Sequence, residues 1–219
     1  MGRRMDLMKC KLLPKLSTGD WKDFCDRFHF PAKELRRIQA IYQALLPLVD
    51  CYAYYSLKQD LPEISLSHYA YGFVTLGNGV DEFSELYLNH EQIQEAYIVD
   101  CISLLLLSKA YEDFAHMIEG GSSLYLEKMS FLGDDYPLDL LPQIYDNLNP
   151  GDISLTESNM LSPLKTATLI LHLDTKRHAA LNQLCNSCDT CKNFSCPSRK
   201  VSAKQIPRTY GAMQIFHKK

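Results

Sequence analysis

Four cysteines near the end of the chain have the spacing of metal ligands. In the stretch CNSCDTCKNFSCPSRK, Cys185, Cys188, Cys191 and Cys196 form a C-x2-C-x2-C-x4-C-P pattern. Three thiols at such short intervals followed by Cys-Pro are typical of iron-sulfur cluster ligands, whereas a structural zinc site usually joins two cysteine pairs across a longer loop. The pattern predicts a metal site holding an iron-sulfur cluster or zinc, and unliganded thiols are the alternative.

Two carboxylates are candidates for a ligand site. Asp100 interrupts an apolar run, so its side chain must find hydrogen-bond donors or be neutral. A structural cap or bridge to the strand end near residues 75–77 is the preferred interpretation, and a ligand contact is the alternative. Glu157 follows a predicted strand in a polar loop, where it could meet a ligand amine or simply be solvated. We expect both to face one cleft between the long helix and the strand ending at Leu155. His172, alone in a strand, is expected to be structural.

The composition narrows the class of protein. The chain has 219 residues, of which 46% are hydrophobic and 22% charged, enough for a sizeable core. Its net charge of -3 predicts no nucleic-acid partner, and no apolar run approaches the roughly 20 residues of a membrane span. We therefore expect a cytoplasmic protein without a membrane partner. In a reducing compartment, the four cysteines scattered among apolar residues are expected to be small buried hydrophobes: Cys10, Cys25, Cys51 and Cys101.

The elements that must position these residues alternate irregularly between helix and strand. Apolar spacing predicts helices over residues 31–49, 89–121 and 138–148, the second being the long spine of the fold. Aromatic and β-branched runs predict strands over residues 52–57, 65–77, 153–155 and 165–173, and Asn78-Gly79 is read as a turn. The short connections favour an α+β fold with a mainly antiparallel, bent sheet packed with a long central helix and several shorter helices.

The predicted organisation has three parts. Residues 1–30 form a basic lead-in, residues 31–175 form the α+β domain, and residues 176–219 form a basic, cysteine-rich tail.

The order of the local patterns from about Leu57 to Arg199 resembles the activation domain of vitamin B12-dependent methionine synthase in its small stand-alone form. The most specific piece is Leu155-Thr156-Glu157-Ser158 followed by Pro163. The tail pattern of Cys188, Cys191, Cys196 and Arg199 is similar to the ending of the stand-alone family, which leaves Cys185 as an optional fourth ligand. The family's long helix also carries an aspartate at the position of Asp100.

This resemblance implies an accessory or reactivation role in cobalamin-dependent methyl transfer, with S-adenosylmethionine as the ligand. Any cobalamin would come from a partner, such as a corrinoid protein or methionine synthase modules, because the chain has no Asp-x-His-x-x-Gly motif. As an enzyme, the chain would at most be a component of that methyltransferase activity. The alternative is a non-enzymatic metal-binding, sensing or interaction module that retains the fold.

The ligand motif of the family is changed in this chain. The family holds the sulfonium ligand around Arg-x-x-x-Gly-Tyr, and the matching positions here are Lys128, Leu132 and Gly133. A shift of the alignment would instead place Met129, Gly133 and Asp134 there. Lysine lacks the planar fork that grips a carboxylate, and leucine adds a side chain where backbone approaches the ligand. We therefore expect weak or no binding of S-adenosylmethionine, with Lys128 as the remaining candidate contact.

Overall fold

The structure, a computed structural model, describes residues 7–58 and 60–177. The chain divides into two compact units, Met1–Asn186 and Ser187–Lys219, and all the described residues belong to the first unit. The fold and the site below are those of this first unit.

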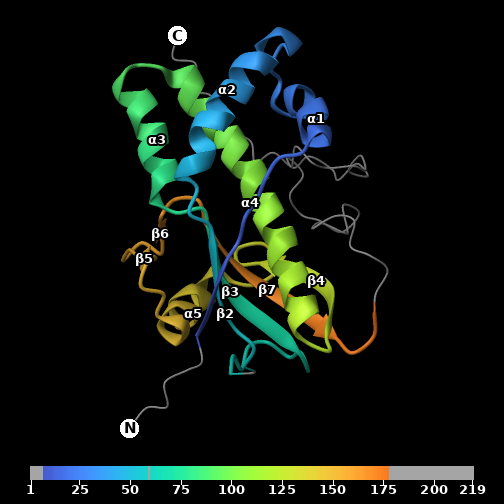
Figure 1. Ribbon diagram of the computed structural model, residues 1–219. Coiled ribbons are helices and arrows are strands. Elements are labelled where there is room, and N and C mark those ends of the chain that lie inside the picture. The colour runs from blue at the N-terminus through green and yellow to red at the C-terminus, as the bar shows by residue number, and fades with distance from the viewer. Residues whose placement is uncertain (1–6, 59, 178–219) are drawn as a thin grey trace, which may run out of the picture. The chain divides into compact units, whose positions relative to one another are not determined.

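An antiparallel sheet is the centre of the unit, with its five strands in the order β1-β2-β3-β7-β4 (Figure 1). The strands are β1 (Met8–Lys11), β2 (Tyr52–Ser56), β3 (Tyr69–Thr75), β4 (Tyr125–Phe131) and β7 (Thr166–Asp174). Every residue of β3 is buried, as its aromatic and β-branched composition favours for a strand covered on both faces. A separate two-stranded hairpin consists of β5 (Ser154–Leu155) and β6 (Leu161–Ser162).

Helices cover the two faces of the sheet unequally. The helices are α1 (Thr18–Phe28), α2 (Leu35–Leu45), α3 (Asn78–Asn89), α4 (Ile93–Gly121) and α5 (Leu141–Leu148). Short 3-10 turns precede α2 at Ala32–Glu34, follow it at Leu46–Leu48, and precede α5 at Leu138–Leu140. The long α4 crosses the sheet, with α1, α2 and α3 gathered around its first half (Figure 1).

Two hydrophobic cores result, one on each face. Alternate residues of β7 divide between them, since Leu169 and Leu171 pack with α4 residues such as Ile102 and Leu106. Ile170 packs on the opposite face with Ile144 of α5. This period of two follows from the pleat of the strand, and it places Thr166, Thr168 and His172 on the α5 face.

Buried tyrosines stiffen the α5 face, because each hydroxyl has a partner. Tyr69 Oη accepts from the Leu61 amide at 2.9 Å, and Tyr71 Oη donates to Asp60 at 2.8 Å. Tyr54 donates to Asp152. A buried hydroxyl without a partner is costly, so these contacts fix the loop residues that they reach.

The edge strand β1 carries two lysines in its four residues. Lys9 Nζ lies 2.6 Å from Asp152 and Lys11 Nζ lies 3.0 Å from Asp50. Lys9 also lies over the Tyr52 ring, at 4.1 Å from its centroid. Both ammonium groups are therefore held across the neighbouring strand.

The predicted α+β class, the antiparallel sheet and the long central helix are confirmed. The interpretation of Asn78-Gly79 as a turn is wrong, because Asn78 begins α3. A Cβ on Gly79 would lie 2.4 Å from the Leu48 carbonyl oxygen, so this glycine permits close helix packing rather than a turn. Strands β1, β4 and β6 and helices α1 and α3 were not predicted.

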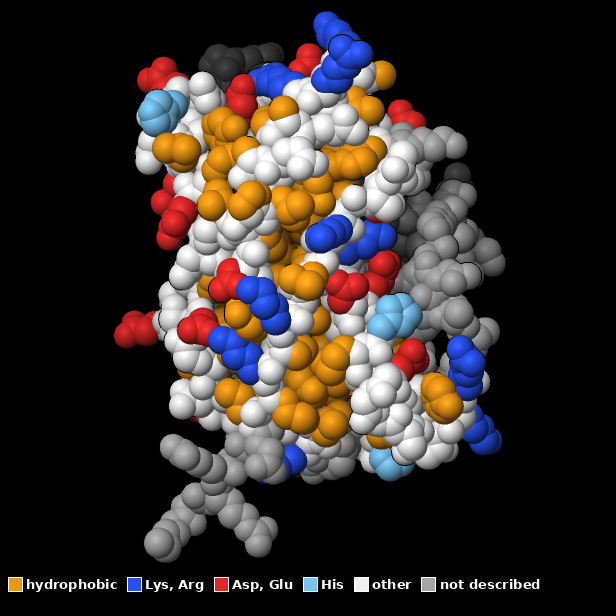
Figure 2. Space-filling model, viewed as in Figure 1, with side chains coloured by type: hydrophobic (Ala, Val, Ile, Leu, Met, Phe, Trp, Pro, Cys, Tyr) orange, Lys and Arg blue, Asp and Glu red, His pale blue; other side chains and the backbone are white. Residues whose placement is uncertain are grey.

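Apolar side chains form a band down the middle of the face seen in Figure 2, along the course of α4. Ile93, Tyr97 and Leu104 of α4 are among the exposed large hydrophobic residues. Within residues 7–58 and 60–177, no helix has both the length and the apolar character needed to cross a membrane.

Candidate functional site

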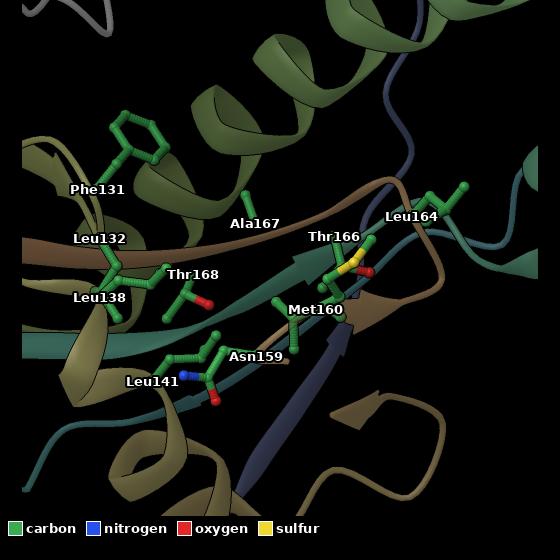
Figure 3. Close-up of a pocket in the computed structure, with 11 residues that line it drawn as sticks. Phe131, Leu132, Leu138, Leu141, Asn159, Met160, Leu164, Thr166, Ala167 and Thr168 are labelled. Carbon is green, nitrogen blue, oxygen red and sulfur yellow. The ribbon is translucent and has the colours of Figure 1, made fainter. Parts of the chain in front are cut away.

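A pocket of about 320 Å³ lies where β4 ends beside the first half of β7 (Figure 3). Its walls come from the end of β4 and the following turn, from α5 with its preceding 3-10 turn, from the β5–β6 hairpin, and from β7. The lining residues are Phe131, Leu132, Leu138, Leu141, Asn159, Met160, Leu161, Leu164, Thr166, Ala167 and Thr168. Apolar side chains with a few polar groups are the usual lining of a small-ligand site.

The pocket exists because β4 ends beside Leu169 and does not extend along the first residues of β7, which begins at Thr166. The last strand pair between them is Phe131 with Leu169, and the Leu132 amide makes a long 3.5 Å contact to the Thr168 carbonyl. The chain then turns away at Gly133, whose φ of +89° favours glycine. The Gly133 amide closes this turn by donating to the Tyr136 carbonyl at 2.7 Å. The first residues of β7 are thereby left without a strand on this side.

The hydroxyl of Thr168 is the most unusual polar group in the pocket. Thr168 is only 7% exposed, and its Oγ1 has no hydrogen-bond partner among the described residues. Thr166, two residues earlier on the same face, donates from its hydroxyl to Thr75 Oγ1 at 2.8 Å. Most buried polar atoms are paired, so an unpaired one on a residue that lines a pocket is a candidate ligand contact.

The hairpin supplies a second polar group. Asn159 adopts a left-handed backbone with φ of 59°, which asparagine tolerates better than most residues. The backbone N–H of Asn159 donates to the Thr156 carbonyl at 3.0 Å, and the backbone N–H of Met160 donates to Thr156 Oγ1 at the same distance. Figure 3 shows the Asn159 side-chain amide beside Leu141 at the pocket. The tight turn of the hairpin therefore positions both Asn159 and Met160.

Three large apolar side chains form an exposed rim around the pocket. Leu138 is 47% exposed, Met160 56% and Leu164 64%. The three come from different walls, so the rim is continuous with the apolar interior. Such a concentration of exposed apolar side chains at a concave site is typical of a binding surface.

Two helical carboxylates hold the wall formed by Leu164. Asp81 of α3 accepts from the Leu164 amide at 2.6 Å, and burial raises the pKa of this carboxyl. Asp100 of α4 forms an ion pair with Lys165, the residue that follows Leu164. The Lys165 carbonyl in turn accepts from the Leu76 amide at 3.0 Å. Asp100 therefore bridges to the strand ends beside β3, which is the structural interpretation raised from the sequence, although its side chain is 46% exposed.

None of the three predicted ligand contacts is part of the pocket lining. Asp100 is paired as described, and Lys128 forms an ion pair with Asp135 at 2.7 Å. Burial acts to raise the pKa of Asp135, but the hydrogen bond from Lys128 helps to hold that pKa below its usual value. Glu157 is exposed in the turn between β5 and β6. The expected shared cleft of Asp100 and Glu157 stays a prediction, but Asp100 already has a cation beside it.

His172 lies half-buried on β7, next to the lysine position of β4. Burial lowers its pKa, and the nearby positive charge of Lys128 lowers it further. The Tyr136 hydroxyl lies 3.4 Å from its Nε2 atom. These contacts join β7 to the turn after β4, in keeping with the expected structural role.

The cysteines that the structure describes are of the inert, buried kind that was predicted. Cys25, Cys51 and Cys101 are buried, and Cys10 is half-buried. Burial raises the pKa of the Cys51 thiol to about 12 and that of Cys101 to about 11. Thiols that stay protonated at neutral pH are poor nucleophiles and poor metal ligands.

The predicted metal ligands Cys185, Cys188, Cys191 and Cys196 lie outside the described residues. Within the described part of the chain, no cluster of three or more histidine, cysteine or acidic side chains could hold a metal ion. The metal prediction therefore concerns only the C-terminal stretch.

Comparison with known proteins assigns no family to the chain. No family model and no curated protein matches the sequence. Among solved structures, the crystal structure of the MetH reactivation domain bound to AdoHcy aligns with 80% of this chain and 81% of that chain, with a TM-score of 0.42 and 10% identity. At this level the similarity assigns neither a family nor a ligand to the chain.

Sequence reasoning missed the pocket itself. Its lining comes from two separate stretches, residues 131–141 and 159–168, and β4, which creates the open edge, was not recognised. One signal was present, since Thr166 and Thr168 place two hydroxyls on the same face of a strand whose middle, from Leu169 to Leu171, is apolar.

Proposed function

We propose that the described unit is a non-enzymatic binding module and that the pocket beside β7 is its ligand site. The observation that supports this most directly is the buried, unpaired hydroxyl of Thr168 in an apolar pocket with an exposed rim. An unpaired buried hydroxyl lowers the stability of the free protein, and a ligand that pairs with it recovers that loss. The lining contains no charged residue, so the part of the ligand that enters is uncharged.

Replacing Thr168 with valine tests this role, because valine keeps the shape and removes the hydroxyl. We expect Thr168→Val to stabilise the free protein by about 1 kcal/mol, which raises Tm by about 2–4 °C for a domain of this size. Thr166→Val is the matched control on the same strand and face. It removes the hydrogen bond to Thr75 and should lower stability by about 1 kcal/mol. Thermal unfolding followed by circular dichroism measures both, and equal destabilisation would show that the Thr168 hydroxyl is structural.

An accessory role in cobalamin-dependent methyl transfer is the second candidate function. One observation favours it: the segment of most specific resemblance, Leu155 to Ser158 with Pro163, builds the hairpin at the pocket and the connection to β7. In this role the chain docks on a corrinoid-carrying partner, and a metal held by the C-terminal cysteines transfers an electron or steadies the complex.

This candidate role does not require tight binding of S-adenosylmethionine. The Lys128 ammonium is already paired with Asp135, and the Leu132 side chain lines the pocket at the position aligned with the family glycine. A ligand carboxylate would have to compete with Asp135, and the sulfonium would enter a pocket without a charged lining residue.

We therefore expect calorimetric titration with S-adenosylmethionine to give a dissociation constant no tighter than about 1 mM, equivalent to about -4 kcal/mol. S-adenosylhomocysteine, which lacks the sulfonium charge, is the matched ligand and should also bind weakly. A low micromolar dissociation constant for either compound, about -8 kcal/mol, contradicts this expectation and would indicate that the protein has a nucleoside-binding site.

A further inference from the structure

The open edge of β7 presents backbone groups with the geometry of an unfilled strand position. In an antiparallel ladder, successive residues direct their amide and carbonyl alternately to the two neighbouring strands. The Lys165 carbonyl accepts from Leu76 of the β3 side, and the Thr168 carbonyl accepts from Leu132 of the β4 side. Thr166 therefore directs its N–H and C=O toward the β4 side, where the described pairing ends at Phe131.

The pocket beside this edge is small enough to suit a single side chain. Its volume of about 320 Å³ is at the lower end of the range for small-molecule sites. Extended peptides that add a strand to a sheet edge gain affinity from main-chain hydrogen bonds and specificity from pockets for alternate side chains. This geometry suits a peptide that places one apolar side chain between Leu138 and Met160, both of which line the pocket.

The segments that carry the pocket also carry unpaired negative charge. Asp134, Asp139 and Glu157 are exposed, and none has an ion-pair partner among the described residues. Asp134 follows the lining residue Leu132 by two positions, Asp139 adjoins Leu138, and Glu157 precedes Asn159 by two. Charge complementarity therefore favours a ligand with basic groups on either side of its apolar anchor.

We propose that this site, if it is the binding site argued above, takes an extended segment of a partner protein. The segment pairs its main chain with the N–H and C=O of Thr166, places one apolar side chain in the pocket, and has lysine or arginine beside that anchor. Main-chain pairing supplies the orientation, the buried side chain supplies most of the affinity, and the carboxylates select basic neighbours.

Selection from a phage-displayed library of random linear peptides tests the inference with the full chain as bait. We expect enriched sequences to share one large apolar residue with lysine or arginine within three positions. A synthetic peptide of the consensus should lose at least tenfold in affinity when the amides flanking the anchor are N-methylated, because methylation removes the strand hydrogen bonds. No enrichment, or a consensus without basic residues, overturns the peptide proposal.

Substitutions at and near the pocket rim test whether the peptide binds at this site. Met160→Asp should weaken consensus-peptide binding at least tenfold, whereas Glu157→Lys and Asp139→Lys should each weaken it by up to about fivefold, an effect that salt reduces. Glu127→Lys, an exposed carboxylate on β4 outside the pocket lining, is the matched control and should leave affinity unchanged.

The outcomes separate this inference from the proposed function. If Thr168→Val raises stability as expected but no peptide is enriched, the pocket stands as a site and its ligand is not a peptide. If peptides bind equally to wild-type and Met160→Asp proteins, they bind elsewhere on the protein, and the peptide proposal is wrong.

Discussion

Gly72→Ala should destabilise the protein by at least about 3 kcal/mol, enough to prevent stable folding of a marginal domain. Gly72 lies in the middle of β3, opposite Tyr55 of β2 and Leu169 of β7. A Cβ at this position would lie 2.3 Å from the Tyr54 carbonyl oxygen and 2.8 Å from the Tyr55 Cβ. Both obstacles belong to a buried neighbouring strand, so relief requires the ladder itself to move.

Gly120→Ala is the matched control for this substitution. Gly120 lies near the end of α4, and a Cβ there meets nothing within 4 Å. Alanine should stabilise the helix by up to about 1 kcal/mol. Urea unfolding of both variants measures the contrast, and similar midpoints for the two would contradict the close approach between β2 and β3.

Cys191→Ser should abolish metal binding by the C-terminal cysteine pattern, whichever metal is present. Three cysteines, Cys188, Cys191 and Cys196, are common to both ligand sets that we propose, and Cys191 is central among them. Replacing a shared thiolate removes a bond that neither a cluster nor tetrahedral zinc can easily replace. Cys185→Ser should matter only if Cys185 is the fourth ligand.

Metal and acid-labile sulfide analysis of anaerobically prepared protein checks this prediction. Iron with sulfide supports a redox cluster, and stoichiometric zinc supports a structural clip. Cys10→Ser is the control, because burial already raises the pKa of that thiol and it lies in β1. Absence of both metals after anaerobic reconstitution, or an essential Cys185 with a dispensable Cys191, would contradict the ligand assignment.

The elements with strong periodicity were predictable, and those defined by tertiary contacts were not. The pattern from Ile93 to Gly121 and the strand from Thr166 to Asp174 are long and apolar, so one helix and one strand explain them. Strand β4 interrupts its apolar positions with Glu127 and Lys128, as an edge strand does. Gly79 in α3 gave a turn signal that close packing against Leu48 explains better.

The candidate site depended on contacts that no single stretch reveals. Asp100 was singled out as needing a partner, and the partner that it has, Lys165, lies 65 residues away in the sequence. Thr168 is an ordinary strand residue in the sequence, and only the early end of β4 leaves it in the lining of a pocket. Sequence patterns predict which residues lie on a face, whereas an opening between elements follows from where each neighbour stops.

The two lysines of β1 affect how molecules of this protein meet one another. An uncovered strand edge can pair with the same edge of another molecule and so begin aggregation, and lysines on a short edge strand oppose this. Lys9 and Lys11, held by Asp152 and Asp50, bring two ammonium groups to that border of the sheet. At the opposite border, β4 carries Glu127 and Lys128. Charged side chains on both edge strands therefore oppose pairing between the sheets of two molecules. The unpaired stretch at Thr166, beyond the end of β4, is too short to support a growing fibril.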